Sequence, residues 1–223
     1  MAFAPGFIET QSWNVWWAKY LASHGFVVIN MDTKSTLEGP ADRRDEQLAA
    51  LKDVIKRSQT MGSPFYGKID PTRQGVMGHS YGGAASLLLA RDYAYLKAAI
   101  PMAAKSPSTK DFSNVAVPTL VIACKGDIVS NNGANSEAIY KSLSPSLDKA
   151  YMELEGGGGH PCTTSLGTSA QVKTTAAKYG VSWLKRFMDD DTRYNQFLCG
   201  APHKADLATA GSKISIYKDN CPF

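Results

Sequence analysis

One short pattern, Gly78-His79-Ser80-Tyr81-Gly82, constrains the fold of this chain more than any other feature. An apolar segment at residues 74–78 leads directly into it, and a segment rich in Gly and Ala follows at 81–91. This order predicts a strand that turns sharply into a helix, with Ser80 on a strained turn where side chains at the two outer glycines would collide with backbone. The pattern therefore favours a serine nucleophile; the alternative is an ordinary helix N-cap serine.

Strand and helix patterns alternate through the rest of the chain. Apolar runs predict strands at residues 26–31, 74–78, 96–102, 118–124 and 149–154, with the tail of another at 1–5, and amphipathic spacing predicts helices at 12–23, 41–61, 81–91 and 169–188. The unbroken apolar run at 26–31 is typical of a strand covered on both faces, and the polar tail from Asp189 onward is typical of a solvated helix end. We therefore expect an α/β fold, a mostly parallel sheet flanked by helices, in a single domain spanning residues 1–223.

Composition argues against several classes of function. The 223 residues carry a net charge of +4 without a Lys/Arg cluster, which argues against nucleic-acid binding. No apolar run approaches the ~20 residues of a membrane span, so we expect no membrane insertion, and the N-terminus lacks the features of a signal peptide. The four cysteines form no Cys-x-x-Cys pair, so we expect no metal site. They favour two disulfides and an oxidising compartment, with free buried thiols as the alternative.

A serine hydroxyl needs a base to take its proton, and His160 is the best candidate. It follows a predicted strand and four glycines, residues 156–159, which allow the loop to bring the ring back over the sheet edge. The other histidines fit less well: His24 lies at a helix end, His79 lies inside the turn and is directed away from the position of a base, and His203 lies in the polar tail. The alternative for His160 is a surface loop histidine.

Asp127 is the candidate for the carboxylate that orients the base. It follows the strand predicted at 118–124, and the resulting order of serine, aspartate and histidine is that of α/β-hydrolases. Asp32 also ends a predicted strand, but it precedes the serine, which is the wrong order. The alternative for Asp127 is a turn aspartate beside Gly126.

An oxyanion formed on the attacked carbonyl needs two backbone N–H donors. One candidate is Tyr81, the residue after the nucleophile. The second donor should come from the loop after an earlier strand, which makes Phe7 of Pro5-Gly6-Phe7 the candidate. The alternative is that Pro-Gly forms only a turn.

Over nearly the whole chain, these residues resemble the bacterial cutinase-like polyester hydrolases, the group that contains the poly(ethylene terephthalate) hydrolases. The strings that carry the resemblance lie at residues 5–7, 17–28, 66–70, 75–83, 117–120, 159–162 and 183–194. The resemblance implies an α/β-hydrolase fold and the hydrolysis of polyesters and short-chain esters through an acyl-enzyme. It also implies Ser80, Asp127 and His160 as a triad, Phe7 and Tyr81 as oxyanion donors, and secretion. No metal or organic cofactor is implied.

The resemblance also implies the cysteine pairing. Cys199 with Cys221 corresponds to a C-terminal disulfide shared across the group, and Cys124 with Cys162 corresponds to a bridge found in one branch. The second bridge would tie the predicted acid loop to the predicted base loop and stabilise the fold by ~2–4 kcal/mol.

Three departures from the family pattern affect the expected substrate site. The chain begins inside an early strand of the family, so we expect the first strands to be missing and an uncovered sheet edge near Met1. The family often carries a tryptophan after the strand that ends near Met102, where this chain has Ala103-Ala104-Lys105 instead, and this difference argues against a preference for aromatic polyesters. Tyr81 stands where a methionine is common. We expect substrate contacts from an apolar wall and this lysine, namely Phe7, Tyr81, Lys105, Val129 and Pro161; the alternative for Lys105 is a solvated loop lysine.

Two rival functions stay open at this point. The same triad would serve a small-ester esterase or an acyltransferase, because the sequence does not separate water from another acyl acceptor. A truncated, catalytically weak remnant or a binding protein is the second rival, because a shortened sheet could fail to hold the Phe7 loop. If the protein is an enzyme, we expect it to be a monomer whose partner is an ester or polyester substrate.

Overall fold

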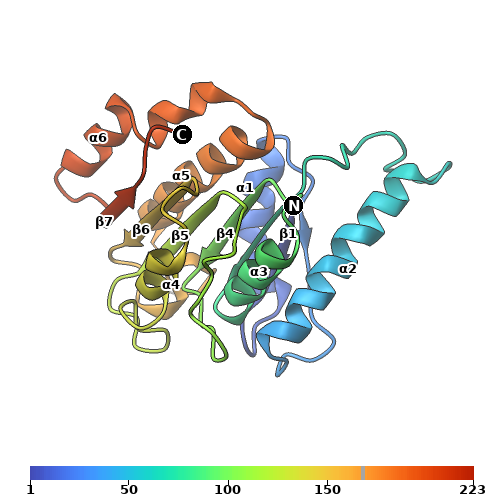
Figure 1. Cartoon of the computed structure of the whole chain (residues 1–223), viewed down its shortest axis with the longest axis horizontal. Helices are drawn as coiled ribbons and strands as arrows, with labels where there is room; N and C mark the ends of the chain where they lie inside the picture. Colours follow the sequence, from blue (N-terminus) through green and yellow to red (C-terminus); the bar gives the residue numbers. More distant parts are fainter. Residues whose placement is uncertain (167–168) are drawn as a thin grey trace.

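The structure, a computed structural model, describes residues 1–166 and 169–223 (Figure 1). Within these residues, seven strands form one sheet in the order β2-β1-β3-β4-β5-β6-β7. Neighbouring strands are parallel except β6 and β7, which are antiparallel. The strands are β1 (Ala2–Ala4), β2 (Ile29–Asn30), β3 (Gly75–His79), β4 (Ala98–Met102), β5 (Thr119–Cys124), β6 (Lys149–Leu154) and β7 (Ile214–Asp219).

Helices cover both faces of this sheet (Figure 1). Helices α1 (Val15–Ser23) and α5 (Ala170–Met188) pack on one face, where Trp17 and Trp183 are fully buried. Helices α2 (Pro40–Gln59), α3 (Tyr81–Asp92) and α4 (Ser136–Ser142) pack on the other. The remaining elements are three short 3-10 helices, η1 (Gln11–Asn14), η2 (His160–Thr163) and η3 (Thr192–Phe197), and helix α6 (Ala201–Ala208) before β7. The predicted α/β-hydrolase fold class is confirmed.

Strand β5 shows why the interior strands of the sheet could be predicted from the sequence. All six of its residues are buried, because β4 and β6 flank it and helices cover both its faces. A strand in this setting needs apolar side chains on both sides, which gives a continuous apolar run.

The prediction for residues 26–31 was wrong in two respects. Only Ile29–Asn30 pair as a strand, and β2 lies at the edge of the sheet with both residues only partly buried. Its partner β1 is only three residues long, which limits how far the pairing extends. Phe26 contributes its apolar side chain to the core packing without joining the sheet.

The expected uncovered edge near Met1 was also wrong. Strand β1 pairs with β2 on one side and β3 on the other, so it is an interior strand. At the opposite edge, β7 was not predicted; only its first residue, Ile214, is buried, and the others are partly buried or exposed. Helices α4 and α6 were not predicted either.

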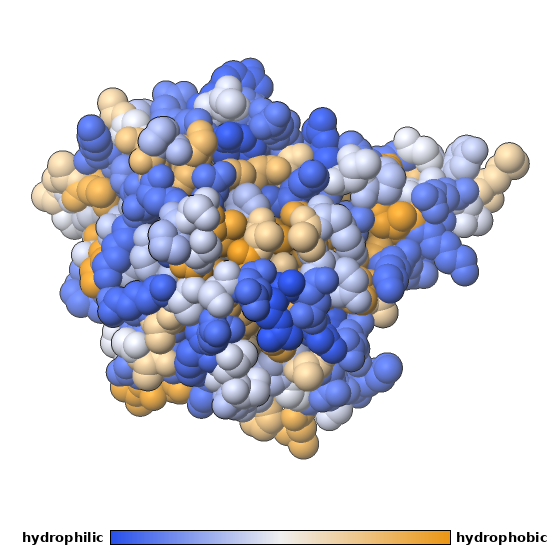
Figure 2. All heavy atoms as spheres, in the orientation of Figure 1, coloured by the Kyte–Doolittle hydropathy of each residue, from blue (hydrophilic) through white to orange (hydrophobic). Residues whose placement is uncertain are grey.

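On the face shown in Figure 2, hydrophilic side chains cover most of the surface and apolar ones gather in small groups. No helix within the described residues combines the length and the apolar character needed to cross a lipid bilayer.

Candidate active site

Ser80 lies on the sharp turn between β3 and α3. Its backbone angles are φ 54° and ψ −118°, which places a non-glycine residue in a strained region. The glycines of the pattern make room for this turn: a Cβ at Gly82 would lie 2.0 Å from the Ala4 carbonyl oxygen, and one at Gly78 would lie 2.4 Å from the Gly82 oxygen. The close approach of three backbone segments therefore requires glycine at both positions.

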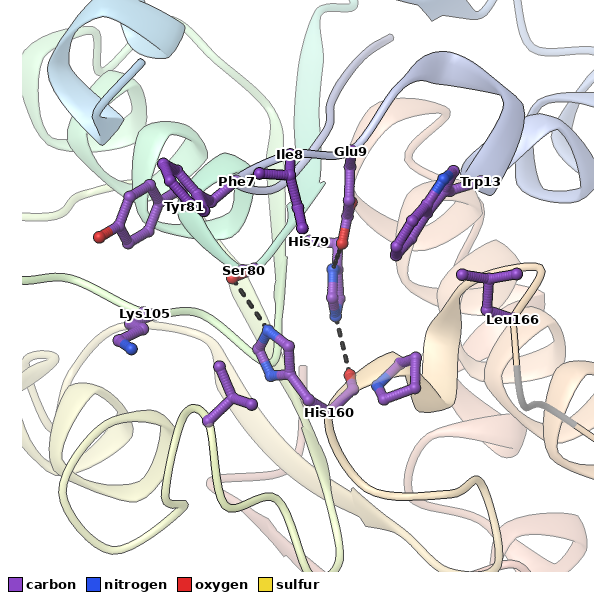
Figure 3. A pocket seen from close by; sticks show the side chains of 12 residues that line it. Phe7, Ile8, Glu9, Trp13, His79, Ser80, Tyr81, Lys105, His160 and Leu166 are labelled. Atoms are coloured by element: carbon purple, nitrogen blue, oxygen red, sulfur yellow. Dashed lines mark hydrogen bonds and ion pairs between the residues drawn. The ribbon is translucent and has the colours of Figure 1, made fainter. Parts of the chain in front are cut away.

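The structure brings the three predicted side chains together, and Figure 3 shows two of them, Ser80 and His160. The Ser80 hydroxyl donates to His160 Nε2 over 3.0 Å, and His160 Nδ1–H donates to Asp127 Oδ2 over 2.7 Å. Asp127 follows β5, and His160 opens η2 after β6, so both lie at the carboxyl ends of parallel strands. Residues separated by up to 80 positions in the chain thus form one continuous hydrogen-bonded run.

The Asp127 carboxylate is fully buried and still held ionised. Its second oxygen, Oδ1, accepts the backbone N–H of Val129 over 2.9 Å and of Ser130 over 2.7 Å. Burial by itself would raise the pKa of Asp127, but the hydrogen bond from His160 and the two backbone donors outweigh it and hold the pKa below its usual range. The carboxylate is therefore negative at neutral pH and fixes the orientation of the imidazole.

The two predicted oxyanion residues both lie beside Ser80. Tyr81 opens α3, and N–H groups in the first turn of a helix have no partner within the helix. The N–H of Phe7 has no hydrogen-bond partner among the described residues. The rings of Phe7 and Tyr81 meet edge to face, 5.6 Å apart, and a Cβ at Gly6 would lie 2.9 Å from the Ser80 Cβ.

A cavity of about 370 Å³ opens above Ser80 and His160. All five predicted substrate contacts line it, namely Phe7, Tyr81, Lys105, Val129 and Pro161. The sequence reading missed Ile8, Trp13 and Leu166, which also line it (Figure 3). Trp13 falls within the helix predicted at 12–23, whose apolar face would pack on the core, but it lies in η1 and borders the cavity. The walls are mostly apolar, which suits a hydrophobic acyl group.

His79, which the sequence analysis directed away from the position of the base, also borders this cavity, whereas His203, His24 and Asp32 lie outside it. His203 is buried against the hydroxyl of Tyr179, with the two atoms 2.8 Å apart, and His24 stacks on Tyr20. Asp32 accepts hydrogen bonds from the backbone and the side chain of Gln11. No group of three or more His, Cys, Asp or Glu side chains among the described residues is placed to hold a metal ion.

A family model described as PETase, PET hydrolase-like, matches residues 1–222. The chain belongs to this family. Three curated relatives agree with the assignment, and each aligns with 100% of the chain. They are a bis(hydroxyethyl) terephthalate hydrolase of Streptomyces coelicolor at 41% identity, Cutinase 1 of Thermobifida cellulosilytica at 39% and a cutinase of Thermobifida fusca at 39%. The chain spans 66%, 79% and 69% of their respective lengths. Family membership assigns this PET hydrolase-like chain to the carboxylic ester hydrolases.

The cysteine pairing implied by the family is present. Cys124 is bonded to Cys162, and Cys199 is bonded to Cys221. The first bridge joins the last residue of β5 to η2, so it links the segment before Asp127 to the segment that carries His160. It therefore fixes the spacing of two members of the hydrogen-bonded run.

Replacing Cys124 and Cys162 together by alanine is expected to lower the free energy of unfolding by about 2–4 kcal/mol, because the bridge closes a loop of 38 residues. The variant should also hydrolyse esters more slowly, because the acid and base segments are no longer joined. Urea unfolding and kcat measure the two effects. The matched control is Cys199→Ala/Cys221→Ala, which removes a bridge away from the cavity. Equal losses of kcat in both variants would contradict a positioning role for the first bridge.

Proposed function

We propose that this PET hydrolase-like protein is a serine hydrolase of polyesters, such as cutin or poly(ethylene terephthalate)-like chains, and of short-chain esters. The observation that carries the proposal is the continuous run from Asp127 through His160 to Ser80, which ends in an apolar cavity. A buried carboxylate, an oriented imidazole and a serine hydroxyl within hydrogen-bond reach are what acyl transfer through a serine ester requires.

In the first half of the reaction, Ser80 Oγ attacks the ester carbonyl carbon while His160 Nε2 takes the hydroxyl proton. The carbonyl π electrons move onto oxygen, and the N–H groups of Phe7 and Tyr81 stabilise that negative charge. Asp127 stays ionised and stabilises the imidazolium through Nδ1–H. The tetrahedral intermediate collapses, the C–O bond to the alcohol breaks, and His160 gives its proton to the leaving alcohol.

In the second half, water replaces the alcohol. His160 takes a proton from the water as the water oxygen attacks the acyl-serine. The second intermediate then collapses: the bond from the acyl carbon to Ser80 Oγ breaks, His160 gives the proton to Oγ, and the acid is released. Every bond and proton change is carried by the substrate, water and these side chains, so the scheme calls on no metal or organic cofactor.

The placement of β1 favours an active enzyme over a remnant. This strand pairs on both sides, so the Phe7 loop starts from the sheet interior. Arg43 of α2 is buried and donates to the Pro5 carbonyl over 3.0 Å, which holds the start of the same loop. We further propose that the protein acts as a monomer outside the cytoplasm, a setting that its two disulfides favour.

A test of the proposed function compares a p-nitrophenyl ester with a film of amorphous aromatic polyester. Release of p-nitrophenol together with soluble acid from the film is the expected result. Release from the small ester alone would reduce the function to a small-ester esterase. Ester products in place of acid, when an alcohol is added, would identify an acyltransferase. No release from either substrate would support the remnant.

Lys105 offers a further prediction about substrate charge. Its backbone N–H donates to the Ser80 carbonyl over 3.1 Å, its side chain borders the cavity, and no carboxylate within the described residues pairs with it. Lys105→Glu is expected to lower kcat/KM for a monoester that carries a free carboxylate by about 5-fold relative to the neutral diester, the size of a surface charge interaction. The ratio of the two kcat/KM values measures this effect, and an unchanged ratio would assign Lys105 to the solvent.

A further inference from the structure

A buried ion pair that the proposed mechanism does not use lies beside the cavity. Glu9, in the loop after β1, and His79, the last residue of β3, are only 3% and 1% exposed. Glu9 Oε1 and His79 Nδ1 are 2.5 Å apart. Withdrawing two charges from water is costly, and such a pair persists only where good hydrogen bonds satisfy its remaining donors and acceptors.

The remaining atoms of this pair contact backbone on either side of it. The second ring nitrogen, Nε2, donates to the His160 carbonyl over 2.9 Å, and Glu9 Oε2 accepts the Gly6 N–H over 2.7 Å. A carbonyl only accepts, so Nε2 carries a proton, and the Glu9 carboxylate accepts a hydrogen bond from Nδ1–H. The His79 ring therefore donates from both nitrogens, as an imidazolium. Burial by itself would lower the pKa of His79, but Glu9 and the carbonyl outweigh it and raise that pKa.

These contacts join three segments that the proposed mechanism needs in register (Figure 3). Gly6 immediately precedes Phe7, the proposed oxyanion donor. His79 immediately precedes Ser80, and its ring lies 4.7 Å from that of His160. One ion pair thus sets the loop, the turn and the base segment relative to one another.

The Phe7 loop has a backbone feature that calls for such a tether. Ile8 has φ 60°, which is unfavourable for a β-branched residue. Its N–H donates to the Thr36 carbonyl over 2.8 Å, and the hydrogen bond from Gly6 to Glu9 holds the other side of Phe7. The loop is therefore strained at one residue and fixed on both sides of the proposed donor.

We propose that the Glu9–His79 pair is a positioning device that sets the Phe7 N–H and the His160 ring relative to Ser80. This inference rests on the proposed function. Neither side chain contacts a reacting atom in the mechanism, so both are positioning residues. A purely stabilising pair is the competing reading. The two readings differ because apolar replacement of a buried ion pair often preserves stability, whereas it removes every hydrogen bond that the pair makes.

The decisive variant is Glu9→Leu/His79→Phe, which replaces the pair by apolar groups. We expect it to melt close to the wild-type temperature, with kcat for a p-nitrophenyl ester about 10²-fold lower and KM changed less than 3-fold, as when a base or an oxyanion donor is misplaced. The rate at which a fluorophosphonate labels Ser80 should fall in parallel. The matched control is His203→Phe, another buried histidine, which should lower the melting temperature without lowering kcat.

Glu9→Gln tests the hydrogen bonds apart from the charge. Opposite a neutral His79, the glutamine amide can donate to Nδ1 while its oxygen accepts from Gly6, and Nε2–H still reaches the His160 carbonyl. Glu9→Ala loses these bonds. Glu9→Gln is therefore expected to keep at least about 10 times the kcat of Glu9→Ala, and this ratio decides the matter if the double variant fails to fold.

A folded double variant with kcat within 3-fold of wild type would overturn the inference, as would equal kcat for Glu9→Gln and Glu9→Ala. The labelling assay separates this failure from that of the proposed function. If fluorophosphonate labels Ser80 in the wild type and labels it at the same rate in the Glu9 and His79 variants, only the positioning role fails. If wild-type Ser80 is not labelled, the proposed function fails and the inference fails with it.

Discussion

Replacing Ser80 by alanine is expected to lower kcat for a p-nitrophenyl ester by on the order of 10⁵-fold, with the protein still folded. The reason is that the proposed acyl-enzyme forms on this hydroxyl. The hydroxyl of Ser80 is the one that donates to His160 Nε2, and its loss leaves the imidazole without a nucleophile to activate. The residual rate would come from water attacking an ester held against the Phe7 and Tyr81 N–H groups.

The control for this variant is Ser86→Ala in α3, the helix that follows Ser80. The Ser86 hydroxyl is buried and donates to the Gly82 carbonyl over 2.9 Å, so its removal should affect stability while leaving kcat close to wild type. The assay is the steady-state rate together with fluorophosphonate labelling followed by mass spectrometry. A Ser80→Ala protein that keeps more than a hundredth of the wild-type rate, or that is still labelled, would rule out Ser80 as the nucleophile.

The sheet interior and the helices α1, α2, α3 and α5 could be predicted because each has a recognisable local pattern in the sequence. Gly78 and Gly82 are required because neighbouring backbone segments leave no room for a Cβ atom at either position. Strand β5 is apolar because both its faces are covered. The two edge strands of the sheet, β2 and β7, have no such pattern. The apolar run that contains β2 includes residues that pack against the core without pairing in the sheet. Strand β7 has one buried residue, so it has no continuous apolar run.

The members of the proposed triad could be chosen from sequence because each follows a strand, and parallel strands end at a common edge. The Glu9–His79 pair could not be chosen in this way. The two residues are 70 positions apart, and only the three-dimensional arrangement shows that a loop carboxylate is buried against a ring at the end of β3. The single sequence signal was an acidic residue placed three positions after Gly6. Trp13 was missed because a tryptophan near a helix start is equally compatible with core packing and with a cavity wall.

Replacing Asp127 by asparagine is expected to lower kcat by about 10⁴-fold with little loss of stability. Oδ1 of Asp127 accepts two backbone N–H groups, so the amide oxygen of asparagine must take that position. The amide NH₂ then faces His160 Nδ1, which can only accept from it. The single proton of the neutral ring moves to Nε2, where it faces the Ser80 hydroxyl. The imidazole keeps its place but no longer has a lone pair to receive the serine proton.

The matched control is Asp32→Asn, the other aspartate that follows a strand. Asp32 accepts from Gln11 outside the cavity, so its replacement should leave kcat unchanged. Steady-state kinetics at a pH where wild-type Asp127 is ionised compare the two variants, and this range includes neutrality because the pKa of Asp127 is held below its ordinary value. A loss of less than 10-fold in Asp127→Asn would show that the tautomer of His160 is fixed by another group. An equal loss of kcat in Asp32→Asn would indicate that Asp32 orients His160, although Asp32 precedes Ser80 in the chain.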